Sequence, residues 1–173
     1  MGTPFAVVYA NIFVFIAIER QLFAQPDLQK PILYFRFIDD IFAVFTTETA
    51  ALAFAGSFTT KHDSISIDTV TSKDSIDFLD ITVFKNQDHA HKQYARLQTK
   101  IFQKERNTYS YIRPSSFHPN GVLRNFILNE LRRYKITCSR LVDYLAMRDL
   151  FRLRLLRRGY TPGFLNQLWI MEI

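Results

Sequence analysis

The sequence has almost no cysteine: Cys138 is the only one among 173 residues. A single thiol excludes an internal disulfide framework and a cysteine-based zinc site, and it favours a reducing, intracellular compartment. Internal repeats and low-complexity segments are absent as well. The composition is 48% hydrophobic with 17 Phe, which is enough for a packed core and excludes a disordered chain.

Neither Lys nor Arg precedes the apolar stretch PFAVVYANIFVFIAI at residues 4–18, although a signal peptide needs a basic region there. The stretch is short for a membrane span, and Asn11 interrupts it. Glu19 and Arg20 follow directly, so we expect a buried helix that ends before Pro26, and no membrane contact.

Acidic residues are scarce in the second half of the chain. Residues 96–173 hold 15 Lys and Arg against 5 Asp and Glu, a net charge of +10. Residues 1–95 hold 7 against 11, a net charge of −4. This division favours a metal-binding or catalytic lobe followed by a polyanion-binding lobe. The alternative is that the C-terminal helices simply have solvated charged faces.

The first half predicts an α+β lobe. Aromatic and β-branched runs on both sides of Asp39 and Asp40 predict a β-hairpin with its tip at residues 38–40. A helix capped by Thr47 should follow over residues 47–58. Alternation predicts strands at 64–70 and 75–85, and a register shift within the second allows a bulge. Residues 93–103 can form a return strand. The candidate inward side chains are those of Ile76, Phe78, Ile81 and Val83.

The second half predicts helices. The first should begin near Ser115, with Pro119 in its first turn, and continue through an amphipathic run to residue 135. The second should cover residues 139–158 and end at Gly159, since Pro162 prevents its simple continuation. The α+β lobe should therefore give way to a helical lobe near residue 105.

The carboxylate pair Asp39 and Asp40 indicates a site for divalent cations. A rigid hairpin tip can hold the hard oxygen ligands that Mg²⁺ prefers, as two-metal phosphoryl transfer requires. Neighbouring strand residues point to opposite faces, so we expect Asp39 to be the main ligand. Neither Glu19 nor Asp27 suits the further carboxylate that such a site needs. An ordinary turn is the alternative.

Several motifs together resemble those of reverse transcriptases. The string YFRFIDDIFAVF is similar to their motif C hairpin, and MGTPFAVVYANIFVFIAIE to their motif B. The later strings SIDFLDITVFK, TKIFQKERNTYSYIRPSSFHPNGVLRNFILNELRRYKITCS and LLRRGYTPGFL resemble, in this order, Penelope-like retroelement polymerases, which are relatives of telomerase. The chain departs from the family pattern where Phe37 replaces Tyr, where Arg132 or Arg133 must serve as the arginine before Cys138, and where Thr161 interrupts Gly-Tyr-Pro.

The resemblance implies an RNA-directed DNA polymerase. Residues 1–105 would be part of its palm, an antiparallel sheet with packed helices that carries motifs B to E, and residues 106–173 would be an all-helical thumb. Asp39 and Asp40 would be catalytic residues that hold two Mg²⁺ ions, or Mn²⁺. The partners implied are an RNA template, a DNA primer, deoxynucleotide triphosphates and an N-terminal part of the same polymerase with the fingers and the motif A carboxylate. Without that part we expect little or no polymerisation. The family implies action in the nucleus.

The resemblance also assigns binding residues. Gly2 and Asn11 would lie near the nucleotide, and Phe78 and Leu79 would begin the hairpin that grips the primer end, where Asp80 can fix the hairpin by a hydrogen bond. Phosphate contacts to the template–primer duplex would come from Arg124, Arg132, Arg133, Arg148, Arg152, Arg154, Arg157 and Arg158. The alternatives are a loop glycine, a buried polar contact for Asn11 and core packing for Phe78 and Leu79. Two other functions also fit: a non-catalytic nucleic-acid-binding remnant, or a structural interaction domain.

Overall fold

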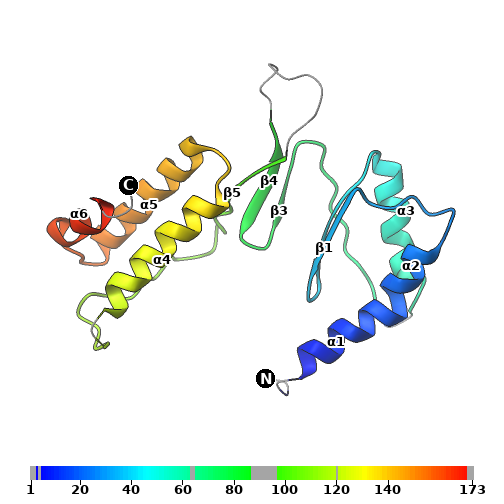
Figure 1. Cartoon of the computed structure of the whole chain (residues 1–173), viewed down its shortest axis with the longest axis horizontal. Coiled ribbons are helices and arrows are strands. Elements are labelled where there is room, and N and C mark those ends of the chain that lie inside the picture. The colour runs from blue at the N-terminus through cyan, green and yellow to red at the C-terminus, as the bar shows by residue number, and fades with distance from the viewer. Residues whose placement is uncertain (1–2, 4, 63–64, 87–96, 120, 171–173) are drawn as a thin grey trace. The chain divides into compact units, whose positions relative to one another are not determined.

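The computed structural model describes residues 3, 5–62, 65–86, 97–119 and 121–170. It is an α+β structure with a two-stranded and a three-stranded antiparallel sheet (Figure 1). The expected α+β class is therefore confirmed. The chain divides into two compact units, residues 1–73 and residues 74–173, called unit 1 and unit 2 below. The predicted palm and thumb would meet near residue 105, whereas the structure groups the second sheet with the helices that follow it.

Unit 1 begins with one continuous helix made of three segments. These are α1 (Ala6–Val14), the π-helical turn η1 (Phe15–Glu19) and α2 (Arg20–Ala24). Only Ile18, Glu19 and Leu22 are buried, so the expectation of a buried helix is wrong for the described residues. Apolar residues at nearly every position predict burial on all sides, but the rest of unit 1 covers only one stripe. By length and composition this helix could cross a membrane, a property shared by core helices and signal sequences.

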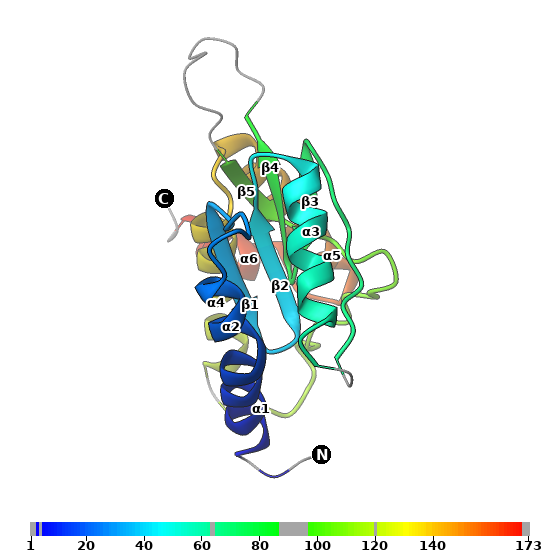
Figure 2. The same ribbon diagram turned by 90° about the vertical axis from the view of Figure 1, so that its right-hand side faces the viewer.

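The hairpin of unit 1 agrees with its prediction. Strands β1 (Leu33–Phe37) and β2 (Asp40–Val44) pair so that Phe37 lies opposite Asp40, which leaves a two-residue turn of Ile38 and Asp39. Figure 2 shows the hairpin alongside α3 (Glu48–Thr59). The Thr47 hydroxyl accepts the Ala50 N–H at 3.2 Å, which confirms the predicted cap.

The core of unit 1 is small and lies between the helices and one face of the hairpin. It consists of Ile18, Leu22, Phe54 and Phe58, with Tyr34, Ile41, Phe45, Ile65 and Ile67 among the side chains packed against it. The strand expected at 64–70 is absent from the described residues 65–70. Alternating apolar residues are not enough without a partner strand, and here Ile65 and Ile67 pack on the core from an irregular segment.

Unit 2 begins with a three-stranded sheet in the order β3 (Ser75–Phe78), β4 (Ile81–Lys85) and β5 (Leu97–Ile101). Ile76 pairs with Val83 and Phe78 with Ile81, so the four predicted inward side chains share one face. The register shift that allowed a bulge is instead a two-residue turn at Leu79 and Asp80, where the chain reverses. The return strand β5 is confirmed.

Three helices complete unit 2: α4 (Val122–Thr137), α5 (Leu141–Arg157) and α6 (Pro162–Ile170). In Figure 1, α4 and α5 lie side by side. Helix α4 starts after Gly121 at φ 87°, so the predicted start at Ser115 with Pro119 in the first turn is wrong. Pro119 and Gly121 both favour a turn, which delays the helix. Gly159 ends α5 as predicted, at φ 96°, and Pro162 opens α6.

The helical core of unit 2 is larger than the core of unit 1. Phe151 is fully buried at its centre, with the rings of Tyr111 and Tyr134 at centroid distances of 5.0 and 5.5 Å. Strand β5 joins this core through Ile101. The Thr99 hydroxyl also donates to the Thr137 carbonyl oxygen at 2.6 Å, and these contacts attach the sheet to the helices.

Candidate functional site

The hairpin of unit 1 carries its two carboxylates at its exposed end. Asp39 occupies the turn, Asp40 is the first residue of β2, and both side chains are exposed. Ile38 has φ 57°, a left-handed conformation that is strained for a β-branched residue. Both carboxylates are thus in contact with solvent, at the end of a hairpin whose strands are largely apolar.

The two aspartates have different surroundings. Cross-strand pairing places Asp40 on the same face as Phe35 and Phe37, each 57% exposed. Asp39 belongs to neither strand. The opposite face of the hairpin carries Tyr34 and Arg36, which point toward the helices. Asp39 and Asp40 thus project from the end of an element that has one packed face and one open apolar face.

A buried ion pair lies behind this tip. The Arg36 Nε donates to Glu19 Oε1 at 2.7 Å, and its Nη2 donates to Oε2 at 3.1 Å. Glu19 is 5% exposed and is the only buried charged residue in the described part of the chain. The Tyr34 hydroxyl donates to Glu19 Oε1 at 2.5 Å. Two strand residues therefore share one carboxylate that comes from the π-turn.

Arg36 also contacts the turn itself. Its Nη1 donates to the Ile38 carbonyl oxygen at 2.8 Å and to Asn11 Oδ1 at 2.6 Å. Its Nη2 also donates to the Asn11 carbonyl oxygen at 3.2 Å. All three guanidinium nitrogens therefore make hydrogen bonds to the helix or to the turn.

This network stabilises the charge states of Tyr34 and Arg36. Burial, together with the hydrogen bond to Glu19, raises the pKa of Tyr34 far above its ordinary value. The hydrogen bond to Glu19 raises the pKa of Arg36. Tyr34 therefore stays a neutral hydrogen-bond donor and Arg36 a cation across the physiological pH range.

The structure gives different outcomes for the site residues predicted in unit 1. Asn11 makes the polar contact that was its alternative, because its side chain accepts from Arg36. Glu19 is occupied by Arg36 and Tyr34, so it is not a metal ligand in this arrangement. Gly2 lies outside the described residues. No group of three or more His, Cys, Asp or Glu side chains suited to a metal ion occurs among the residues the structure describes. Asp39 and Asp40 therefore have no third such side chain beside them in the described part of the chain.

The predicted primer-end residues lie at a second hairpin of the same design. Leu79 also has φ 57° and is 36% exposed, whereas Phe78 is half-buried. The core alternative thus fails for Leu79. The Asp80 carboxylate accepts from Arg133 Nη1 of α4 at 2.5 Å, so its contact reaches another element rather than its own hairpin. Burial lowers the pKa of Arg133, but the hydrogen bond to Glu130 and the nearby carboxylates outweigh this effect and raise it overall.

The predicted phosphate-binding arginines fall into two groups. One group braces unit 2: Arg133 as above, Arg152 on Asn166 Oδ1 at 2.5 Å, Arg154 on Gln103 Oε1 at 2.6 Å, and Arg158 on the Tyr111 carbonyl oxygen at 2.8 Å. Arg154 also stacks 3.6 Å from the Tyr109 ring centroid. Arg148 contacts its neighbour Asp149 at 3.4 Å. The remaining members are exposed: Arg124, Arg132 and Arg157.

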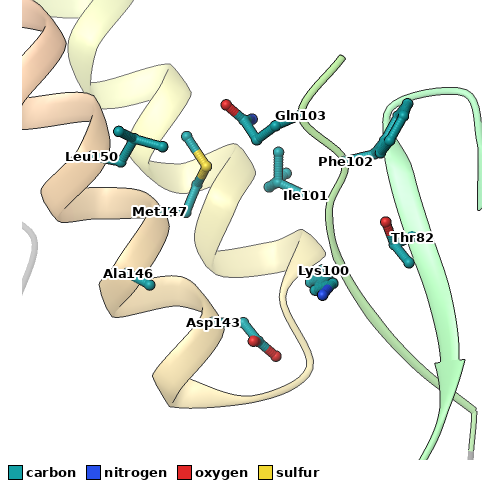
Figure 3. Close-up of a pocket in the computed structure, with 9 residues that line it drawn as sticks. All are labelled: Thr82, Lys100, Ile101, Phe102, Gln103, Asp143, Ala146, Met147 and Leu150. Atoms are coloured by element: carbon teal, nitrogen blue, oxygen red, sulfur yellow. The ribbon is translucent and has the colours of Figure 1, made fainter. Parts of the chain in front are cut away.

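A pocket of about 360 Å³ lies in unit 2 between β5 and α5 (Figure 3). Met147 and Leu150 give it an apolar floor, while Lys100 and Asp143 supply charge. Asp143 is already paired with Arg140 at 2.6 Å. None of the predicted site residues lines this pocket, and its side chains do not form a cluster suited to metal-dependent chemistry.

Comparison with known proteins identified no matching family model, no matching curated protein and no matching solved structure. The likeness to reverse transcriptases thus rests on the sequence motifs alone.

Proposed function

We propose that this chain is the C-terminal part of an RNA-directed DNA polymerase of the Penelope-like type, with part of the palm followed by a helical thumb. The observation that carries the proposal is the hairpin turn that presents Asp39 and Asp40 to solvent at the end of a packed element. An ordinary surface turn has no need of a buried glutamate behind it that is paired with an arginine of the hairpin.

The donor chemistry at this tip fits Mg²⁺. Exposed carboxylate oxygens are hard ligands, and an ion that retains several waters needs only one or two protein carboxylates together with substrate phosphates. Two bound Mg²⁺ ions would activate the primer hydroxyl and stabilise the charge on the transferring phosphate. The task of Asp39 and Asp40 is to hold these ions, and the resemblance assigns a further carboxylate to a segment outside the 173 residues.

Unit 2 would bind the template–primer duplex. It holds 17 Lys and Arg against 9 Asp and Glu, a net charge of +8. Arg124, Arg132 and Arg157 are exposed, so they can reach phosphates. The arginines that brace the helices would act by keeping this surface in shape. This charge balance also supports the second candidate, a nucleic-acid-binding remnant without catalysis.

Duplex binding by the 173-residue chain is expected to depend strongly on salt. The logarithm of the binding constant falls as the logarithm of the salt concentration rises. Each lost phosphate contact should make this negative slope shallower by roughly 0.7–0.9. The double variant Arg132→Gln/Arg157→Gln should therefore flatten the slope, measured by fluorescence anisotropy with a labelled RNA–DNA hybrid. Arg20→Gln, an exposed arginine of unit 1, is the matched control and should leave the slope unchanged.

The outcomes separate the candidate functions. Binding without salt dependence, or no binding, contradicts both nucleic-acid functions and favours a structural domain. Primer extension with Mg²⁺ then separates the polymerase from the remnant. The isolated chain should extend a primer poorly or not at all, while a version joined to a segment that supplies the fingers and the further carboxylate should extend it. Failure of the completed protein to extend a primer would leave the remnant as the explanation.

A further inference from the structure

Behind the tip with Asp39 and Asp40 lies a hydrogen-bonded network that the metal-site motif does not require. The first component is the π-turn Phe15–Glu19, where the helix widens. Single π-turns inside α-helices occur frequently at functional sites. Here the turn ends in Glu19, which is 5% exposed, while most of the surrounding helix is exposed. A buried carboxylate costs several kcal/mol unless it is paired, so the fold must supply a cation at this point.

Arg36 supplies that cation and then reaches further. Its guanidinium donates two parallel hydrogen bonds to Glu19 and still has donors for Asn11 and for the Ile38 carbonyl oxygen. This use of the planar fork is specific to arginine, because a lysine ammonium has no fixed plane. The side chain of Arg36 is 11% exposed, so water competes little for these bonds.

The contact to Ile38 falls on a strained residue. The Ile38 carbonyl belongs to the peptide that leads into Asp39, and Ile38 itself is held at φ 57°. A β-branched residue keeps this conformation only where its surroundings impose it. The hydrogen bond from Arg36 fixes the orientation of that peptide, and with it the direction in which Asp39 leaves the turn.

The second hairpin provides an internal comparison. Leu79 has the same φ of 57°, and its turn also contains an aspartate, Asp80. The residue two places before it is Asp77, whose carboxylate accepts from the Thr82 hydroxyl at 2.6 Å. Of these two hairpins, only the one with the adjacent aspartates Asp39 and Asp40 at its tip has an arginine at this position, bound to a buried glutamate.

We infer that Arg36, seated by Glu19 and Asn11, is a positioning residue that holds the turn so that Asp39 and Asp40 present their oxygens to metal in one geometry. The inference rests on the proposed function, since it assumes that this tip binds metal. Groups behind a metal ligand orient it, and their loss typically lowers metal affinity about 10–100-fold.

The experiment measures order and metal binding separately in the 173-residue chain. Without metal, amide hydrogen exchange of Asp39 and Asp40 should be faster in Arg36→Lys than in the wild type. Asn11→Ala removes one hydrogen-bond acceptor of Arg36 and leaves the ion pair with Glu19 in place, so it should also speed this exchange, but by less. The control is Arg20→Lys, which changes an exposed arginine of the helix that also carries Asn11 and Glu19. NMR signals of α3 report whether each variant is folded.

Metal binding is then followed by paramagnetic broadening of the amides of residues 38–41 during a Mn²⁺ titration. The wild type should bind, Asp39→Asn/Asp40→Asn should not, and Arg36→Lys should need about tenfold more Mn²⁺. Unchanged exchange in Arg36→Lys, or unchanged Mn²⁺ affinity, would overturn the positioning role while the metal site stands. Broadening at the tip that survives in Asp39→Asn/Asp40→Asn, or its absence from the wild type, would instead overturn the metal site and the inference with it.

Discussion

Replacing Asp39 with Asn is expected to lower the rate of nucleotide addition by about 10²–10³-fold in a polymerase that contains this segment together with its remaining palm and fingers. Asparagine keeps the shape and the turn preference of aspartate but removes the negative charge that attracts a divalent cation. Because Asp39 is exposed and occupies a turn, the free energy of unfolding should change by no more than about 0.5 kcal/mol. The loss should therefore appear in single-turnover primer extension and not in thermal unfolding.

Asp27 offers the matched control for this prediction. It is an exposed carboxylate of the same unit that lies outside the hairpin, so Asp27→Asn removes an equal charge elsewhere. Asp27→Asn should extend primers at the wild-type rate. If both substitutions slow extension equally, the loss of one negative charge anywhere in unit 1 explains the effect, and Asp39 has no special role.

Replacing Phe151 with Ala is expected to cost about 3–5 kcal/mol of folding free energy, the range typical of a buried phenylalanine. Phe151 is 0% exposed, and the rings of Tyr111, Phe126, Tyr134 and Trp169 have centroids 5.0–6.3 Å from its own. The neighbours come from α4, α6 and the segment before α4, so a cavity here weakens most contacts of the helical core.

Trp169 makes this measurement specific to unit 2, since it is the only tryptophan of the chain. Urea unfolding followed by its fluorescence should show a large shift of the midpoint for Phe151→Ala. The control Leu153→Ala changes a residue of the same helix that is 44% exposed, and should shift the free energy by about 0.5 kcal/mol or less. Equal shifts for the two variants would contradict the packing described for this core.

Local sequence signals were sufficient for several elements. The hairpin tip followed from two β-forming runs around Asp39 and Asp40, the start of α3 from Thr47, and the end of α5 from Gly159. Each of these features depends on residues close together in the sequence: turn chemistry, a cap, or a glycine with positive φ. Such preferences act before any tertiary contact forms, so a sequence can reveal them.

The support behind the tip could not be predicted in the same way. Glu19 and Arg36 are 17 positions apart, and their pairing depends on how the helix packs against the hairpin. One signal was available: each of these charges lies within or at the end of a strongly apolar run, and opposite charges in such positions are candidates for a buried pair. The strand expected at 64–70 failed for the complementary reason, since a strand needs a partner that the local pattern does not supply.

The most direct test is anomalous diffraction from Mn²⁺ in crystals of the completed polymerase with a primer–template duplex and an incoming deoxynucleotide triphosphate. An anomalous peak should lie about 2.0–2.3 Å from an Asp39 carboxylate oxygen, the distance expected for a small divalent cation on oxygen ligands. A Mn²⁺ peak bound to the triphosphate but out of reach of both Asp39 and Asp40 would contradict the assignment of this hairpin as a metal-binding tip.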